Sequence, residues 1–500
     1  MRKKDSFDSR WGFVLAAIGM ALGTGNIWRF PRVVAANGGS SFIIAWTVAL
    51  IVWSMPLLMA EMVLGRKTGL GCPGAFRDFM GRKFTWMGTW MGVVCLGIAV
   101  FYSVVMGWCL KYCVLFLTGA FESGVTAGET EAMWNAFLAA PDQTILFHGI
   151  SVILAGVVVY KGVHQGIERA CKLIIPVLFT LLVIVAVRAL TLPGASEGVG
   201  YLFTPHLKDL ANPKVWLEAF TQSAWSTGAG WGFLIVYGVY TKKKDDIGLN
   251  CVLTGLGNNA ASLLAGLAVI PAIFALSATP EAANDAMSAG NSGLTFIYLA
   301  SLFPTMPGGN IMGSMFFFAM TIAALSSLIA MYELGIRIVC DFNVSRKKAA
   351  LWVVIGCFTL GLPSAVKSTF LDNQDFVWGV ALLISGLLCA LAMMKYGVEK
   401  ARTEIINHKW SNLYIGKWWS ACIWMFPLMF ACVFGWWMRQ AFADHPDNWW
   451  SPVEPFSPGT MLLQWGILVT LALVLNKTIA AKTIKGYDMT QAPEEEEEAV

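Results

Sequence analysis

Charged residues are scarce in this sequence. Asp, Glu, Lys and Arg together make up 13% of its 500 residues, whereas hydrophobic residues make up 57%, and the mean hydropathy is +0.62. Soluble globular domains carry about a quarter charged residues, since polar side chains must cover their surface. The composition therefore excludes an ordinary soluble protein and predicts a chain whose apolar segments lie in a membrane.

Patterns typical of catalysis are also lacking. The sequence contains no P-loop, no nucleophile elbow and no HExxH motif, and its five histidines fall in predicted loops or at the ends of apolar segments. These absences argue against an enzyme, an ATP-driven pump and a histidine-based metal site or proton relay. The eleven cysteines form no C-x-x-C pair, and we interpret them as packing residues. We expect no nucleic-acid partner.

Apolar runs long enough to span a bilayer recur along the chain. We predict twelve spans, at 12–36, 39–64, 86–118, 145–160, 171–191, 219–240, 249–277, 309–339, 350–365, 376–396, 418–438 and 460–480. Between the seventh and eighth spans, the stretch GLTFIYLASLF is a candidate for an external re-entrant helix.

Basic and acidic residues are unevenly distributed among the loops. GRKTG, GRKF, YTKKKDD and VSRKK are basic, whereas FESGVTAGETEAMWNAFLAAPD carries four acidic residues and no Lys or Arg. The positive-inside rule places the basic loops and both termini in the cytoplasm. We expect no cleavable signal, because Arg29 and Pro31 directly follow the first apolar run. The tail APEEEEEAV is expected to be solvated and disordered.

Two spans carry poor helix formers in their middle. The first contains GTGN at 23–26, and the sixth contains WSTGAGWG at 225–232. They open two groups of five spans, so an odd number of crossings inverts the second group relative to the first. Matched Gly-interrupted segments in inverted halves are typical of a transporter's binding site at mid-membrane. Close helix packing through small residues is the alternative, and the G-x-G clustering favours unwound backbone.

Unwound backbone within a membrane has a chemical consequence. Freed amides attract an anion such as a carboxylate, and freed carbonyls coordinate a cation such as sodium, which prefers oxygen ligands. Further candidate oxygens lie one turn apart in other spans, although a single Ser or Asn in a span more often serves a helix–helix hydrogen bond. Charges within spans, such as Arg29, Glu61 and Asp375, are also functional candidates, because an unpaired charge there is costly.

GTGNIWRFPRVVAANGGSSF resembles the first-helix signature of the neurotransmitter:sodium symporters. The resemblance continues through AEMVLGRKTG, KGVHQGIERACKLIIP, QSAWSTGAGWG and AALSSL and covers nearly the whole chain. It implies the LeuT-like fold, an all-α polytopic membrane protein with 12 transmembrane helices and alternating access coupled to sodium. The implied parts are a cytoplasmic N-terminus (1–11), two inverted five-helix repeats (12–191 and 219–396), two additional helices (418–480) and an acidic cytoplasmic tail (481–500).

The resemblance also implies binding residues, including two sodium sites. The first sodium is expected at Ala21, Asn26, Ser226 and Asn258 together with the substrate carboxylate, and the second at Gly19, Leu22, Ala323, Ser326 and Ser327. The substrate is expected to contact Met20, Gly23, Gly25, Ile98, Tyr102, Trp225, Ser226, Gly228, Trp231, Ser327 and Met331. Gln222, Ser226, Asn258 and Ser262 match chloride ligands, but Trp46 replaces the expected tyrosine, so chloride dependence stays open.

Gates on both sides follow from the same resemblance. Arg29 and Asp375 correspond to the outer gate, with Tyr102 and Trp225 closing over the substrate. At the inner gate, Lys4 replaces the usual arginine opposite Asp341, and Phe7 replaces a tryptophan. Lysine lacks the bidentate fork of arginine, so a looser gate is expected. Gly166 and Pro176 match the helix-five unwinding motif, proposed to open a sodium exit path.

The substrate class depends on one position. Family members that carry amines have Asp where this chain has Gly23, so the substrate here is expected to bring its own carboxylate. Gly228 leaves room for a side chain, and Trp225, Trp231 and Met331 offer an aromatic, polarisable wall. These residues favour a large hydrophobic or aromatic amino acid.

The sequence thus predicts a sodium-coupled symporter for a neutral amino acid, embedded in the lipid of a bacterial inner membrane. A proton-coupled carrier is the nearer alternative, and a channel or sensor that uses the same site is the other. Gates on both sides of a central site favour alternating access over a continuous pore. Oligomeric state, ion stoichiometry and the individual amino acid are not predicted.

Overall fold

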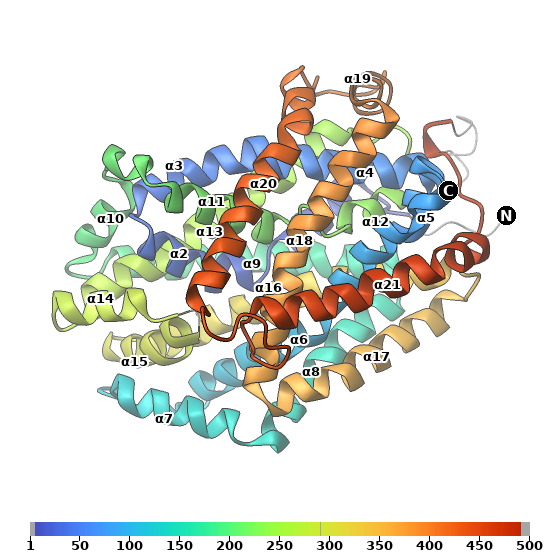
Figure 1. Cartoon of the computed structure of the whole chain (residues 1–500). Helices are drawn as coiled ribbons and strands as arrows, with labels where there is room; N and C mark the ends of the chain where they lie inside the picture. Colours follow the sequence, from blue (N-terminus) through green and yellow to red (C-terminus); the bar gives the residue numbers. More distant parts are fainter. Residues whose placement is uncertain (1–5, 291, 492–500) are drawn as a thin grey trace.

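The structure, a computed structural model, describes residues 6–290 and 292–491, so the acidic end of the tail lies outside the described residues. Every regular element in these ranges is a helix (Figure 1). Ten helical segments are long and apolar enough to cross a membrane. They are α3–η2–α4 (Ser40–Thr68), η3–α6 (Arg82–Leu117), α8 (Pro141–Tyr160), η4–α9 (Val163–Leu190), α13 (Ile247–Leu276), α16 (Gly309–Cys340), α17 (Arg346–Val366), α18 (Ser368–Tyr396), α20 (Trp418–Asp444) and α21 (Pro458–Lys482).

The first and sixth predicted spans are each made of two shorter pieces. α1 (Arg10–Ala21) and η1–α2 (Gly25–Ala36) meet at a bend of 53°. α11 (Pro213–Thr227) and α12 (Phe233–Val239) are separated by residues 228–232, in which three glycines have φ between +73° and +91°. Side chains with a Cβ avoid this region, so glycine permits the break. With these two broken spans, all twelve predicted apolar segments coincide with helices.

The remaining elements are short helices outside the spans. They are α5 (Cys72–Met80), α7 (Ala127–Leu138), α10 (Ala195–Phe203), η5 (Leu207–Ala211), α14 (Pro280–Ser288), η6 (Gly293–Tyr298), α15 (Leu299–Leu302), η7 (Phe303–Thr305), α19 (Val398–Lys400), η8 (Ala401–Ile406) and η9 (Met489–Gln491). The stretch GLTFIYLASLF is helical, as predicted, and its Phe296 ring stacks on Trp134 of α7 with centroids 4.6 Å apart.

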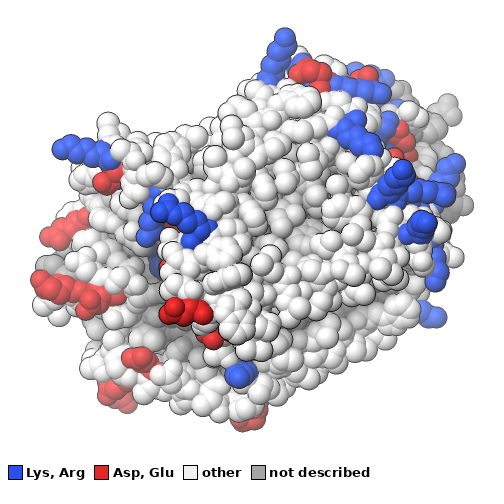
Figure 2. All heavy atoms as spheres, viewed as in Figure 1, with Lys and Arg blue, Asp and Glu red and all other residues white. Residues whose placement is uncertain are grey.

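The bundle has a buried centre and an apolar outside. α6 and α16 pack against each other within it, whereas α20 and α21 run along one face (Figure 1) and expose side chains such as Trp424, Leu428 and Val474. Figure 2 shows a broad uncharged surface on this face, with most Lys and Arg gathered at the end where both termini lie and most acidic residues at the other. Exposed apolar side chains between two charged ends fit a lipid-facing surface.

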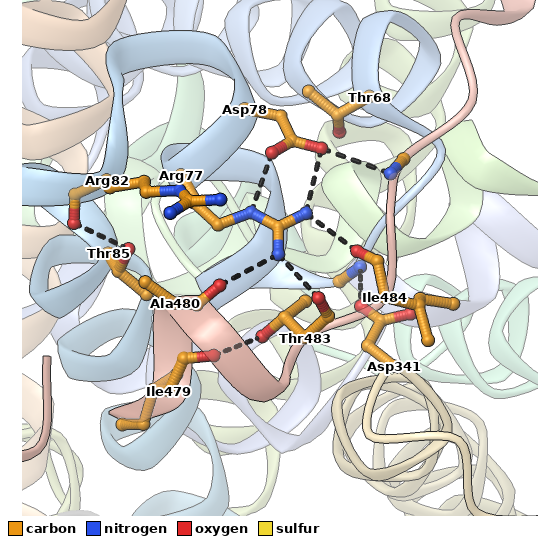
Figure 3. A network of polar contacts seen from close by, with 12 residues as sticks. Thr68, Arg77, Asp78, Arg82, Thr85, Asp341, Ile479, Ala480, Thr483 and Ile484 are labelled. Atoms are coloured by element: carbon orange, nitrogen blue, oxygen red, sulfur yellow. Dashed lines mark hydrogen bonds and ion pairs between the residues drawn. The ribbon is translucent and has the colours of Figure 1, made fainter. Parts of the chain in front are cut away.

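The chain that follows α21 is tied to the end of the bundle that carries the termini (Figure 3). Arg77 of α5 donates hydrogen bonds to Asp78 and to three backbone carbonyls, those of Ala480, Thr483 and Ile484. The Ile484 amide in turn donates to the Asp341 carbonyl at 2.8 Å, directly after α16. The C-terminal segment therefore joins α5 to the end of α16.

Candidate functional site

The break between α1 and η1 frees backbone carbonyls. The Gly23 amide donates to Asn26 Oδ1 at 3.0 Å, and the Thr24 amide donates to Tyr102 Oη at 2.9 Å. In a continuous helix these two amides would bond to the carbonyls four residues earlier, at positions 19 and 20. Because the amides turn to side chains instead, those carbonyls are available to a ligand.

Serine hydroxyls of α16 donate to backbone carbonyls near this break. Ser326 Oγ donates to the Leu22 carbonyl at 3.1 Å and to the Ala323 carbonyl at 2.9 Å. Ser327 Oγ donates to the carbonyls of Leu22 at 3.0 Å and Met20 at 3.2 Å. Four of the five residues predicted for the second sodium are thus in mutual contact, and Gly19 precedes them in the last turn of α1. An all-oxygen group of this kind suits a hard cation.

A second polar group gathers around Asn26. Its Nδ2 donates to Asn258 Oδ1 at 2.7 Å and to Ser262 Oγ at 2.8 Å, and Asn258 Nδ2 donates to Ser226 Oγ at 3.2 Å. A half-turn of the Asn26 amide would bring its oxygen against two further oxygens, an arrangement that a cation would stabilise. Ala21 lines a small cavity, described below, together with Asn26 and Ser226. The residues predicted for the first sodium therefore lie together.

The candidate chloride ligands are only partly assembled. Ser226, Asn258 and Ser262 belong to the group around Asn26, but both ends of the Gln222 amide are engaged elsewhere. Its Nε2 donates to the Gly25 carbonyl at 2.9 Å, and its Oε1 accepts from Arg29 at 2.5 Å. In this structure Gln222 connects the Gly25 carbonyl to Arg29 within the first broken span, and its part in a chloride site stays a prediction.

A small cavity of about 20 Å³ lies between the two breaks. It is lined by Met20, Ala21, Gly23, Gly25, Asn26, Tyr102, Trp225, Ser226, Gly228, Trp231, Phe233, Ser327 and Met331. This set contains every residue predicted to contact substrate except Ile98, which is buried one turn before Tyr102 on α6. The cavity does not extend to Ile98 in this structure, so its contact with substrate stays a prediction.

Aromatic rings form one wall of the cavity. Trp225 and Trp231 meet edge to face at 5.4 Å, and Trp231 stacks on Phe233 at 5.2 Å. Phe233 was not predicted as a lining residue. The positive φ angles at residues 228, 230 and 232 direct the chain so that 231 and 233 both reach the cavity, and neither helical nor strand periodicity indicates this.

Glycine is needed on the opposite wall because other groups lie close to the backbone. A Cβ added to Gly23 would lie 2.5 Å from Tyr102 Oη and 2.7 Å from Ser327 Oγ. One added to Gly25 would lie 2.8 Å from the Trp225 ring. The backbone of the first break is thus exposed to the cavity without an intervening side chain.

Glu61 is a further residue of the site that the sequence indicated only as a charge within a span. Its carboxylate accepts hydrogen bonds from the amides of Gly230 at 2.7 Å, Gly232 at 3.1 Å and Leu234 at 3.0 Å. These bonds replace the helical partners that the break between α11 and α12 removes. A buried acid in an apolar span was the signal for this role.

A larger cavity of about 480 Å³ adjoins the small one, and Gly25, Tyr102 and Trp225 line both. Arg29 and Asp375 also line it, yet among the residues that the structure describes no ion pair joins them. Arg29 contacts Glu218 at 3.7 Å and Gln222 instead. The predicted pairing of Arg29 with Asp375 is therefore not formed in this structure.

Side chains fill the space between the site and the end of the bundle that carries the termini. The Phe7 ring is buried and lies 5.6 Å from the Tyr237 ring, and the Phe7 amide donates to the Tyr240 carbonyl at 3.1 Å. Phe7 thus packs at the position where the family that this chain resembles usually has a tryptophan. The interior is closed here, whereas the larger cavity lies on the other side of Tyr102 and Trp225.

The predicted inner gate can be followed only through Asp341, because Lys4 lies outside the described residues. Asp341 contacts Arg337 at 2.8 Å and accepts a hydrogen bond from the Gly71 amide at 2.6 Å. Burial raises the pKa of Asp341 to about 6, although Arg337 opposes this shift. Asp341 therefore already has a cationic partner within its own helix, and its pairing with Lys4 stays a prediction.

The proposed helix-five motif is helical here. Gly166 lies in η4 (Val163–Glu168), where its amide donates to the Gly162 carbonyl at 3.1 Å, and Pro176 lies inside α9 (Arg169–Leu190). The predicted unwinding between them is thus absent from this conformation. That state accompanies the closed packing around Phe7.

Comparisons with known proteins agree with this geometry. The chain matches the model of the sodium:neurotransmitter symporter family over residues 4–137 and 145–486. It is 32% identical to an uncharacterized sodium-dependent transporter of Methanocaldococcus jannaschii, over 84% of this chain and 87% of the relative. It is 30% identical to the uncharacterized sodium-dependent transporter YhdH of Bacillus subtilis, over 87% and 97%.

A solved structure shares the fold. The crystal structure of MhsT in complex with L-phenylalanine superposes with a TM-score of 0.77 at 30% identity, over 86% of this chain and 99% of that one. The LeuT-like, all-α fold expected from the sequence is thereby confirmed. The chain belongs to the sodium:neurotransmitter symporter family: it is a sodium-dependent multi-pass membrane transporter of a small molecule, and not an enzyme.

Proposed function

We propose that this chain carries a neutral amino acid together with sodium, by alternating access around the cavity between the two breaks. The observation that carries this proposal is the charge of the cavity. None of the described residues that line it is charged, and Gly23 leaves no room for an acidic side chain. A sodium ion there needs an anion to balance it, since a buried unpaired charge is costly. A substrate carboxylate supplies that anion.

The roles within the site follow from the contacts. The first sodium would be held by Ala21, Asn26, Ser226 and Asn258 with the substrate carboxylate, and the second by Gly19, Leu22, Ala323, Ser326 and Ser327. Tyr102 Oη already accepts from the Thr24 amide, and its own proton would be donated to the substrate carboxylate. Freed carbonyls of the breaks would accept from the substrate's ammonium group.

A large hydrophobic or aromatic substrate side chain fits the aromatic wall. Trp225, Trp231 and Phe233 present ring faces and edges, and Met20 and Met331 are adaptable neighbours. A cavity of about 20 Å³ has room for about one water molecule, so these side chains must move apart to admit the substrate. MhsT, crystallised with L-phenylalanine, supports this substrate class.

The same proposal includes the orientation and internal symmetry. Residues 12–191 and 219–396 would form inverted repeats, and the basic end of the bundle with both termini would face the cytoplasm of a bacterial cell. The larger cavity then opens to the outside, and the packing around Phe7 closes the inside. Arg29 and Asp375 would approach each other when the outer cavity closes over a bound substrate.

A binding screen tests the proposal. Purified protein is titrated with each amino acid and with tryptamine, in sodium and in potassium, each with chloride or gluconate. Large neutral amino acids should bind only in sodium, and tryptamine, which lacks the carboxylate of tryptophan, should not bind. Equal binding of tryptamine and tryptophan, or binding that is independent of sodium, would contradict the proposal. The gluconate series decides chloride dependence.

A further inference from the structure

Glu168, the last residue of η4, lies in a dense set of contacts at the closed side of the site. Its carboxylate is fully buried and accepts hydrogen bonds from the amides of Asp8 at 2.8 Å and Ser9 at 3.3 Å, and from Ser9 Oγ at 3.1 Å. Lys172 contacts it at 2.7 Å and His164 at 3.2 Å, each one turn away on the same helix. The contacts with Asp8 and Ser9 join residues about 160 positions apart in the chain.

These contacts hold the first turn of α1. Ser9 is the N-cap of α1, and its hydroxyl accepts from the Gly12 amide at 3.0 Å. A Cβ on Gly12 would lie 1.9 Å from Glu168 Oε1, so the carboxylate approaches α1 only because residue 12 is glycine. A carboxylate at a helix N-terminus is also favoured by the helix dipole. Lys172 offsets the cost of burying the charge.

Both helices that Glu168 connects carry residues with a role in the proposed transport cycle. The far end of α1 carries the carbonyls of the candidate sodium sites. Gly166, two residues before Glu168, belongs to the segment expected to unwind. Unwinding there would change the spacing of Glu168 from its partners at 164 and 172 and draw the carboxylate away from α1.

We propose that Glu168 is a positioning residue that locks α1 against α9 in the inward-closed conformation, and that unwinding at Gly166 releases it. The inference rests on the proposed alternating-access function. It adds to the predicted gate of Lys4 and Asp341 a second inner contact, a carboxylate that holds backbone amides. Glu168 holds the amides of Asp8 and Ser9, which directly precede α1.

A native cysteine reports on the lock. Cys171 on α9 is 1% exposed, and its Sγ would lie 3.3 Å from a Cβ at Gly19, so α1 covers it. Cys95 in α6 is 0% exposed and serves as an internal reference for an intact fold. Alkylation at each cysteine is read by mass spectrometry on purified protein in sodium, so the measurement needs no substrate.

The decisive variants are Glu168→Gln, which removes the charge, and Gly12→Ala, which keeps Glu168 but displaces it. Both should raise the rate of Cys171 alkylation at least about tenfold while Cys95 stays protected. Glu404→Gln, a surface substitution at the same end of the bundle, should leave both rates unchanged. Sodium-dependent amino-acid binding by the unmodified protein is measured in parallel, so failure of the proposed function is seen separately.

Unchanged Cys171 rates in both variants would overturn the proposal. If Glu168→Gln also exposes Cys95, that variant has lost its fold, and Gly12→Ala decides. If both substitutions expose Cys95 together with Cys171, Glu168 is a general structural residue and the lock is refuted. Glu168→Asp, which keeps the carboxylate, should give a Cys171 rate near that of the unmodified protein, and this result would support the proposal further.

Discussion

The Tyr102 hydroxyl accepts a hydrogen bond from the Thr24 amide at 2.9 Å, and this contact ties α6 to the broken first span. The same hydroxyl would lie only 2.5 Å from a Cβ added to Gly23. One side chain therefore holds the break open and stands beside the position at which a substrate carboxylate is proposed to bind.

Removing this hydroxyl should weaken substrate binding. Tyr102→Phe leaves the Thr24 amide without its acceptor and removes the donor to the carboxylate, so we expect the amino-acid Kd to rise about tenfold or more. Tyr112→Phe is the matched control, because Tyr112 lies on the same helix and its hydroxyl is buried outside the cavity. Equilibrium binding of labelled substrate measures both, and an unchanged Kd for Tyr102→Phe would place the carboxylate elsewhere.

Adding an acid to the first break should have a stronger effect. Gly23→Asp introduces a Cβ that clashes with Tyr102 and Ser327 and a carboxylate that repels the substrate carboxylate. Amino-acid binding should fall by at least about a hundredfold, whereas Gly23→Ala, which adds the Cβ alone, should cost less. Isothermal titration separates the two, and equal losses would mean that charge repulsion plays no part.

Sodium binding should depend on the asparagines around the cavity. Asn258→Ala removes an oxygen and a partner of Asn26, and we expect the sodium concentration needed for half-maximal binding to rise about tenfold or more. Asn250→Ala, on the same helix and equally buried but away from the cavity, is the control. Scintillation proximity binding against sodium concentration gives both values. Similar shifts in the two variants would refute the assignment.

The stability of the folded protein should depend on pH through Asp341. Since its pKa is raised from 3.8 to about 6, the folded protein binds this proton more tightly than the unfolded chain does. This group's contribution therefore favours folding most at low pH and is lost as pH rises from about 4 to about 6. Thermal midpoints of the unmodified protein and of Asp341→Asn are measured between pH 4 and 7. The midpoint of the unmodified protein should fall relative to that of Asp341→Asn as the pH rises across that range. A constant difference would contradict this account.

The C-terminal segment should depend on Arg77. Arg77→Ala leaves three carbonyls without their donor, which we expect to lower the free energy of unfolding by about 2 to 4 kcal/mol. Arg77→Lys should recover only part, because a compact ammonium lacks the planar fork whose two nitrogens reach the three carbonyls. Arg82→Ala, an exposed neighbour, should change little. Denaturation in detergent measures all three, and equal stability of Arg77→Ala and Arg82→Ala would contradict the role of this contact.

The spans and the two breaks could be predicted from the sequence because their signals are local. Long apolar runs identify the helices, and the glycines at 23, 25, 228, 230 and 232 lie where the helices end. The ligand groups around Asn26 and Ser327 came from the family resemblance, since helical spacing alone favoured helix–helix hydrogen bonds. The residues predicted to contact substrate also came from that resemblance, and all of them except Ile98 line one cavity.

What the sequence could not predict depends on contacts between distant segments or on the conformation. Nothing in the sequence near Glu168 indicates that its carboxylate accepts a hydrogen bond from the Asp8 backbone amide. Nothing near Glu61 indicates its three amide partners. The pairing of Arg29 with Glu218 and Gln222 belongs to one state of a moving protein, and a resemblance to a family does not select the state. Phe233 was missed because the glycine-rich break has no regular periodicity.

In the proposed function, a sodium gradient drives uptake of a neutral amino acid. The most direct measurement is accumulation of labelled phenylalanine or tryptophan in proteoliposomes at equal internal and external pH. An inward sodium gradient should concentrate the label above its external level, and potassium in place of sodium should abolish this. Accumulation driven by a pH gradient without sodium, or label that only equilibrates whatever the sodium gradient, would contradict the account.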